Sequence, residues 1–130
     1  MGPSGKIMIK AYLWINAVLY FALVIWCSVK HGQTSKASGY VTLDNSGHSE
    51  YLVIYGGLQL GLAVFFAYLA SVVPLHRTGL IFSLMLYVPI VIYRVVTVIS
   101  YSPVSAVTWA TGALETVLLI GALVLYFREN

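Results

Sequence analysis

Arg94 and Glu115 are the two charged side chains that fall well inside strongly apolar stretches of this sequence. An ionised group deep in a bilayer is costly, so such a residue normally meets an opposite charge or lines a polar cavity. The two residues flank a tight turn near Ser102, roughly 12 and 19 Å below it at about 1.5 Å of helical rise per residue. An extended arginine can span that offset. The sequence therefore predicts a direct or water-bridged pair on two adjacent helices.

Further polar residues recur inside the apolar stretches at helical spacing. Tyr12, Asn16 and Tyr20 are each four residues apart, as are Tyr55 and Gln59, so each set shares one helix face. Because lipid offers no hydrogen bonds, we expect these side chains to converge in the centre of a bundle. The predicted polar centre, which is either a ligand-binding site or a structural element, comprises Arg94, Glu115, Asn16, Gln59, Tyr87, Tyr93 and Thr111.

Two interpretations of the charged pair remain open from the sequence. A buried ion pair can fix which helices meet and in what register. An intramembrane ionisable residue is equally a candidate for binding or transport. Loss of one partner is damaging under either interpretation, so that observation alone does not separate them.

Residue types needed for other chemistries are absent or badly spaced. The three histidines, His31, His48 and His76, lie outside the apolar stretches, so they offer neither axial haem ligation nor metal-site spacing. No serine or cysteine has a base nearby at useful spacing, and there is no glycine-rich phosphate loop. The basic residues form no run that would favour nucleic acid. We therefore expect a non-enzymatic protein without a metal or cofactor.

The elements that position these residues follow from composition. The chain has 130 residues, 60% hydrophobic and only 8% charged, whereas a soluble domain carries about a quarter charged residues. A fold this short could not hide so much apolar surface from water. The sequence predicts one integral membrane domain (1–130), an all-α antiparallel four-helix transmembrane bundle with one longer polar loop between helices 1 and 2. Its spans are expected at about 8–29, 51–73, 79–100 and 104–127.

The connections and the basic residues set the expected topology. Short links at 74–78 and 101–103 favour antiparallel neighbours. More basic residues fall on the side of the two termini than on the side of the long loop, which favours cytoplasmic termini and an external loop. Within that loop, residues 39–47 alternate briefly and then carry turn residues, which fits either a small β-hairpin arm or an irregular loop.

From about residue 50 onward, the sequence carries a set of glycines, turn prolines and charges: Gly56-Gly57, Leu60-Gly61, Pro74, Arg77, Gly79, Arg94, Pro103 and Glu115. With these features it resembles a family of small four-span bacterial membrane proteins that is described only as a domain of unknown function. The family pattern has a small residue just before its arginine, where this chain has Tyr93. The resemblance implies a bacterial four-helix bundle, and hence an inner-membrane location, but no activity.

Three functions are compatible with these residues. In the first, the bundle binds an apolar or amphipathic small molecule or a lipid, whose head group the polar centre orients, or it serves as an accessory subunit of a larger membrane complex. In the second, it is a small homodimeric proton-coupled transporter, because its length and four spans resemble those of the small multidrug-resistance exporters. Those exporters carry their essential acid in the first span, where this chain offers only Asn16. In the third, it is a purely structural assembly subunit.

Glu115, the one acidic residue inside an apolar stretch, bears on the transporter hypothesis through its pairing. Glu115 is expected to have Arg94 as its counter-ion, and an adjacent cation stabilises the ionised carboxylate. A carboxylate held in that way exchanges protons poorly. The sequence therefore favours a binding or accessory role over proton-coupled transport.

Overall fold

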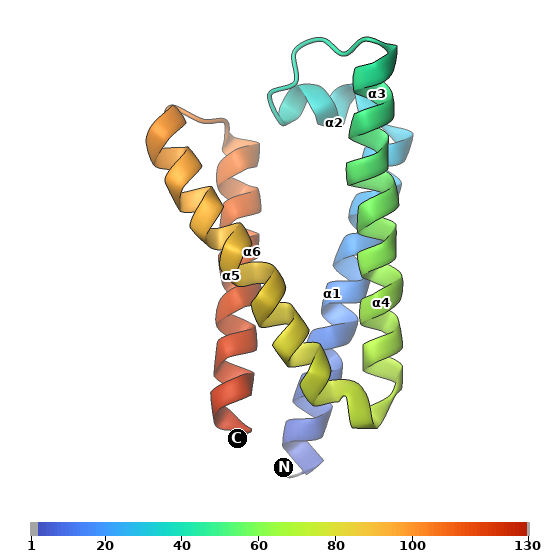
Figure 1. Cartoon of the computed structure of the whole chain (residues 1–130), viewed down its shortest axis with the longest axis vertical. Helices are drawn as coiled ribbons and strands as arrows, with labels where there is room; N and C mark the ends of the chain where they lie inside the picture. The colour runs from blue at the N-terminus through green and yellow to red at the C-terminus, as the bar shows by residue number, and fades with distance from the viewer. Residues whose placement is uncertain (1–2, 130) are drawn as a thin grey trace.

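The structure, a computed structural model that describes residues 3–129, is all-helical in that range (Figure 1). Residues 1, 2 and 130 of the predicted domain lie outside the described part of the chain. Four helical stretches are long and apolar enough to cross a membrane, which confirms the predicted number of spans and is typical of a multi-pass membrane protein. They are Pro3–Val29, Asn45–Ser71, Val73–Tyr101 and Ala106–Arg128.

The individual elements divide these stretches further. The first stretch is helix α1 and the last is helix α6, with a short helix α2 after α1. The second stretch is α3, a π-helical segment η1 and α4 in unbroken succession, and the third is a short 3₁₀ turn η2 followed by α5. Their bounds are α1 Pro3–Val29, α2 His31–Ala37, α3 Asn45–Leu52, η1 Val53–Leu58, α4 Gln59–Ser71, η2 Val73–Leu75, α5 His76–Tyr101 and α6 Ala106–Arg128.

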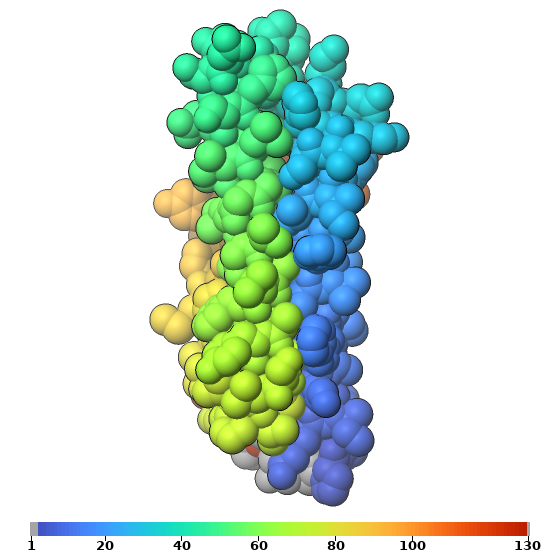
Figure 2. Space-filling model, turned by 90° about the vertical axis from the view of Figure 1, so that its right-hand side faces the viewer, coloured from blue at the N-terminus to red at the C-terminus, as the bar shows by residue number. Residues whose placement is uncertain are grey.

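The long helices associate as two pairs. Helix α1 packs mainly against α4, and Figure 2 shows the two lying side by side along their length. Helix α5 packs mainly against α6, and it crosses from the base of the α1–α4 pair to the far end of α6 (Figure 1). The first and last described residues lie at the same end of the molecule. At that end, the Arg77 guanidinium stacks over the Tyr126 ring, 5.1 Å from its centroid.

The hydrophobic core is concentrated at the end that holds the chain termini. All buried residues of α5 lie in its first half, from His76 to Tyr87, and residues 88–101 contribute none. Gly79 lets α5 approach α1 closely, because a Cβ there would lie 2.8 Å from the Leu13 methyls. The two helix pairs are therefore tightly packed at one end and only loosely in contact at the other. This uneven packing determines where a cavity can form.

The predicted polar loop after the first span is largely helical, and the β-hairpin alternative is not formed in this segment. Helix α2 ends at Ala37 and is followed by Gly39, whose φ of 96° suits glycine. Gly39 N–H donates to Lys36 O, and Tyr40 N–H donates to Ser35 O. Asp44 is the N-cap of helix α3, and its carboxylate accepts from Gly47 N–H at 2.7 Å. The turn residues that resembled a hairpin are thus the caps of two helices.

Two irregular features occur inside the apolar helical stretches. Helix α5 runs unbroken through Pro89. The π-helical segment Val53–Leu58, in contrast, has no sequence signal that we recognised. Such segments insert an extra residue into a helix and are frequent at functional sites. Here the segment supplies Ile54 and Leu58 to the cavity described below.

Candidate functional site

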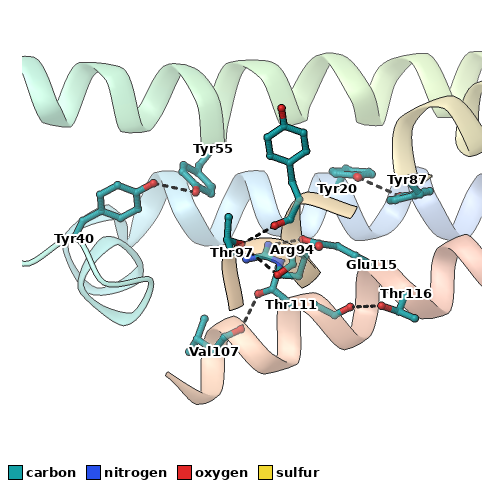
Figure 3. Close-up of polar contacts among 12 residues, drawn as sticks. Tyr20, Tyr40, Tyr55, Tyr87, Arg94, Thr97, Val107, Thr111, Glu115 and Thr116 are labelled. Atoms are coloured by element: carbon teal, nitrogen blue, oxygen red, sulfur yellow. Dashed lines mark hydrogen bonds and ion pairs between the residues drawn. The ribbon is translucent and has the colours of Figure 1, made fainter. Parts of the chain in front are cut away.

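The structure brings Arg94 of α5 and Glu115 of α6 into direct contact (Figure 3). Arg94 Nη2 donates to Glu115 Oε1 at 2.6 Å, and Arg94 Nε donates to Oε2 at 3.1 Å. This two-point geometry fixes the relative orientation of both side chains as well as their distance. The Arg94 side chain is 32% exposed and that of Glu115 is 15% exposed. The pair therefore joins the two helices in the loosely packed half of the molecule.

Gly112 makes room for the arginine. A Cβ at this position would lie 3.2 Å from Arg94 Cγ and 3.3 Å from Cδ, so the arginine stem crosses α6 directly over the glycine. The sequence analysis did not single out Gly112. Its position three residues before Glu115, on nearly the same helix face, is the signal that could have found it.

A chain of hydroxyl and amide groups lies next to the pair, towards the packed end. Tyr87 donates its single proton to Asn16 Oδ1, an atom that can only accept. The Tyr20 hydroxyl, 3.1 Å from that of Tyr87, must then be the donor between the two phenols. Asn16 Nδ2 donates to Tyr12 O at 2.9 Å, and Tyr12 donates to Leu118 O at 2.7 Å. The network ties α1 to α5 and α6 and leaves the Tyr20 oxygen able to accept.

A cavity of about 240 Å³ lies between the two helix pairs. Every one of the four long helical stretches contributes to its wall, and most of the lining is apolar. The polar part of the wall comes from side chains that were far apart in the sequence, namely Tyr20, Gln59, Tyr87, Thr111 and Glu115. A mainly apolar cavity with a few convergent polar groups is the usual form of a small-molecule site.

Gln59 is the one member of this polar wall whose hydrogen bonding is incomplete at a buried atom. Its carboxamide oxygen is shielded from solvent and accepts no hydrogen bond within the described chain. A buried acceptor without a partner costs about 1–3 kcal/mol. Such an atom in a native fold calls for a donor that occupies the cavity, which is either a water molecule or a ligand.

The seven residues of the predicted polar centre are distributed unequally. Arg94 and Glu115 form the pair; Asn16 and Tyr87 are fully buried in the hydroxyl network; and Gln59 and Thr111 line the cavity. Thr111 is also bonded to its own helix, because its hydroxyl donates to Val107 O at 2.8 Å.

Two tyrosines depart from that expected set. Tyr93 is 74% exposed and contributes only its carbonyl, which accepts from Thr97 at 2.8 Å. Tyr20, which the set lacked, lines the cavity. Its spacing of four residues from Asn16 is the signal that could have added it.

The polar groups on the cavity wall are suited to recognition through hydrogen bonds. Glu115 is the single carboxylate on the cavity wall, and its two oxygens are already held by a guanidinium. No group of three metal-ligating side chains occurs among residues 3–129. What the wall offers is a row of acceptors, formed by Gln59 Oε1, the Tyr20 oxygen and the outer lone pairs of Glu115.

No family model, curated protein sequence or solved structure matches this chain. The resemblance to the small four-span bacterial family therefore stays a prediction. Function has to be argued from the geometry of the site.

Proposed function

We propose that this protein is a non-enzymatic, antiparallel four-helix membrane protein that binds an amphipathic small molecule between its helix pairs. The ligand's polar end carries a hydrogen-bond donor and lies against Gln59 and Glu115, and its apolar body fills the rest of the cavity. The observation that carries the proposal is the buried, unpartnered oxygen of Gln59 on the wall of an otherwise mainly apolar cavity.

The size of the cavity limits the ligand. An apolar protein cavity of roughly 150 Å³ accommodates benzene, and the cavity here measures about 240 Å³. A body the size of two fused six-membered rings, or a short branched hydrocarbon, is therefore the appropriate scale. A longer molecule would have to extend past the open end between the helix pairs.

A matched pair of probes tests this proposal. 1-Naphthol and naphthalene share a shape and differ by one hydroxyl donor. In neutral-detergent micelles, we expect the protein to bind 1-naphthol about tenfold more tightly, the equivalent of one satisfied buried hydrogen bond. Gln59→Leu should abolish that preference, and the same substitution at Gln33, on the short helix α2, should leave it unchanged. Equal affinity of the native protein for both probes would exclude the proposed donor site.

The membrane and orientation form part of the same proposal. The protein lies in a bacterial inner membrane with both termini in the cytoplasm, supported by the excess of basic residues at the terminal end. An accessory role in a larger membrane complex, or a homo-oligomer, is compatible with this placement. In that case, purification from native membranes would yield a stoichiometric complex whose other subunits cover the cavity.

Proton-coupled transport is the weaker candidate. It requires Glu115 to release and take up protons, and the carboxylate is held at two points by Arg94. Substrate flux driven by a pH gradient in vesicles, lost in Glu115→Gln, would replace ligand binding with transport as the better account.

A further inference from the structure

A second depression, separate from the interior cavity, lies between α5 and α6. It has a volume of about 530 Å³ and shares no lining residue with the interior cavity. Its walls are valine, isoleucine and alanine side chains, interrupted by Arg94, Thr108, Trp109 and Thr116. We call it the α5–α6 groove. The ion pair therefore separates two spaces, with Glu115 facing the cavity and Arg94 facing the groove.

Arg94 has unused hydrogen-bonding capacity on the groove side. A guanidinium has five N–H donors, and Glu115 accepts from only two of them. Within the described chain, Arg94 makes no other side-chain hydrogen bond. Its side chain is about one-third exposed and lines the groove, so the remaining N–H groups can turn towards it. Leaving charged donors unpaired in hydrocarbon is costly, which favours an acceptor from the membrane.

The second polar group on the groove wall that is unpaired within the described chain, the indole N–H of Trp109, is also a donor. Trp109 is 60% exposed, and its indole N–H makes no hydrogen bond within residues 3–129. The two threonine hydroxyls already interact locally, Thr116 with Gly112 O and Thr108 with Ser105. No acidic side chain lines the groove. A wall with a cation and donors, but no carboxylate, is complementary to an acceptor-rich anion.

The depth of Arg94 in the membrane decides which anion can reach the α5–α6 groove. Arg94 precedes the end of α5 at Tyr101 by seven residues, or about 10 Å at the rise of an α-helix. Helix α5, with 26 residues, measures about 39 Å and exceeds a hydrocarbon core of about 30 Å by several ångström at each end. By this estimate Arg94 lies about 6 Å inside the hydrocarbon boundary, a depth from which a long side chain can reach lipid head groups. Trp109 lies at the depth of the interfacial aromatic belt.

We propose that the α5–α6 groove binds one membrane phospholipid, whose phosphodiester accepts hydrogen bonds from Arg94 and Trp109. One acyl chain lies on the apolar wall towards Ala113 and Val117. Gly112 is essential to this arrangement, because its missing side chain lets the arginine stem lie across α6 beside the groove. The lipid and the cavity ligand occupy different spaces on either side of the pair.

The test uses Trp109 as a reporter. The chain has three tryptophans, and Trp14→Phe with Trp26→Phe leaves Trp109 alone; both replaced side chains are exposed on the outer surface. In maltoside micelles, this protein is titrated with phosphatidylglycerol carrying brominated acyl chains, or with diacylglycerol carrying the same chains. We expect saturable quenching by the phospholipid at a half-saturation about tenfold lower than for diacylglycerol, as for a charge-assisted hydrogen bond of about 1.5 kcal/mol or more.

Two variants locate the effect. Arg94→Gln with Glu115→Gln removes both charges without changing net charge, and should raise the phospholipid's half-saturation to that of diacylglycerol. Arg77→Gln removes a cation at the other end of the chain and should change nothing. Equal quenching by the two lipids in the native background, unchanged quenching in the double variant, or equal loss in Arg77→Gln would each overturn the proposal. Gln59→Leu should leave the quenching intact, so this result is independent of the cavity ligand.

Discussion

The Arg94–Glu115 pair allows a quantitative prediction about the stability of the bundle. Two unit charges about 4 Å apart attract each other by about 4 kcal/mol at an effective dielectric constant of about 20. Desolvation of both groups opposes that attraction, and the one-third exposure of Arg94 screens part of it. We therefore expect a coupling free energy of about 2 kcal/mol between the two side chains, which is half of the Coulomb value.

The two single substitutions should lower the free energy of unfolding by different amounts. Arg94→Gln leaves the less exposed partner, Glu115, charged and unpaired beside an apolar cavity, and should lower the free energy of unfolding by about 3 kcal/mol. Glu115→Gln leaves an arginine that can turn towards the groove, and should cost about 2 kcal/mol. The double substitution should cost about 3 kcal/mol, since neither charge is then left alone and the two amides can still bond.

Unfolding by sodium dodecyl sulfate in mixed micelles, followed by far-ultraviolet circular dichroism, measures these free energies. Lys36→Gln combined with Glu50→Gln serves as the matched cycle, because these two side chains are exposed and form no ion pair with each other. We expect no coupling in that cycle. If the losses at Arg94 and Glu115 add to within about 0.5 kcal/mol, the pair does not act as a unit and the reasoning is refuted.

The same unfolding measurement tests two further contacts. Tyr87→Phe leaves the buried Asn16 oxygen without its donor and should cost about 1–3 kcal/mol, whereas Tyr68→Phe, at an exposed position without a side-chain hydrogen bond, should be neutral. Gly112→Val must displace the arginine stem and should cost about 1–3 kcal/mol more than Gly61→Val, where a Cβ meets no atom within 4 Å. Equal costs for either matched pair would contradict the assigned contact.

Much of the fold was accessible from sequence because the bilayer imposes a strong constraint. An apolar run of sufficient length has to be a helix, since lipid leaves its backbone groups no other partner. For that reason, four long apolar helical stretches overlap the predicted positions, and α1 begins already at Pro3, a residue that suits the first turn of a helix. The secondary structure of the polar segment after α1 was harder to predict, since glycine and aspartate serve both as hairpin-turn residues and as helix caps. Gly39 and Asp44 prove to be caps.

The candidate site was only partly predictable. Charge and depth identified Arg94 and Glu115, because few partners are possible inside a membrane. Helical spacing could not show that Tyr93 is left exposed, since the burial of a residue depends on how α5 crosses its neighbours. The cavity is lined by residues from the middle of α5, where its close packing ends, and by a π-helical segment. Both are consequences of tertiary packing that no local pattern encodes.

A structure determined in lipid nanodiscs from native membranes would test the central claim most directly, through the density between the helix pairs at Gln59. The proposal predicts an elongated feature in the cavity, larger than a water molecule, with a polar atom at hydrogen-bonding distance from the Gln59 carboxamide oxygen and an apolar body against Leu62 and Leu86. A cavity closed by side chains, or one that contains only ordered water on Gln59, would contradict it.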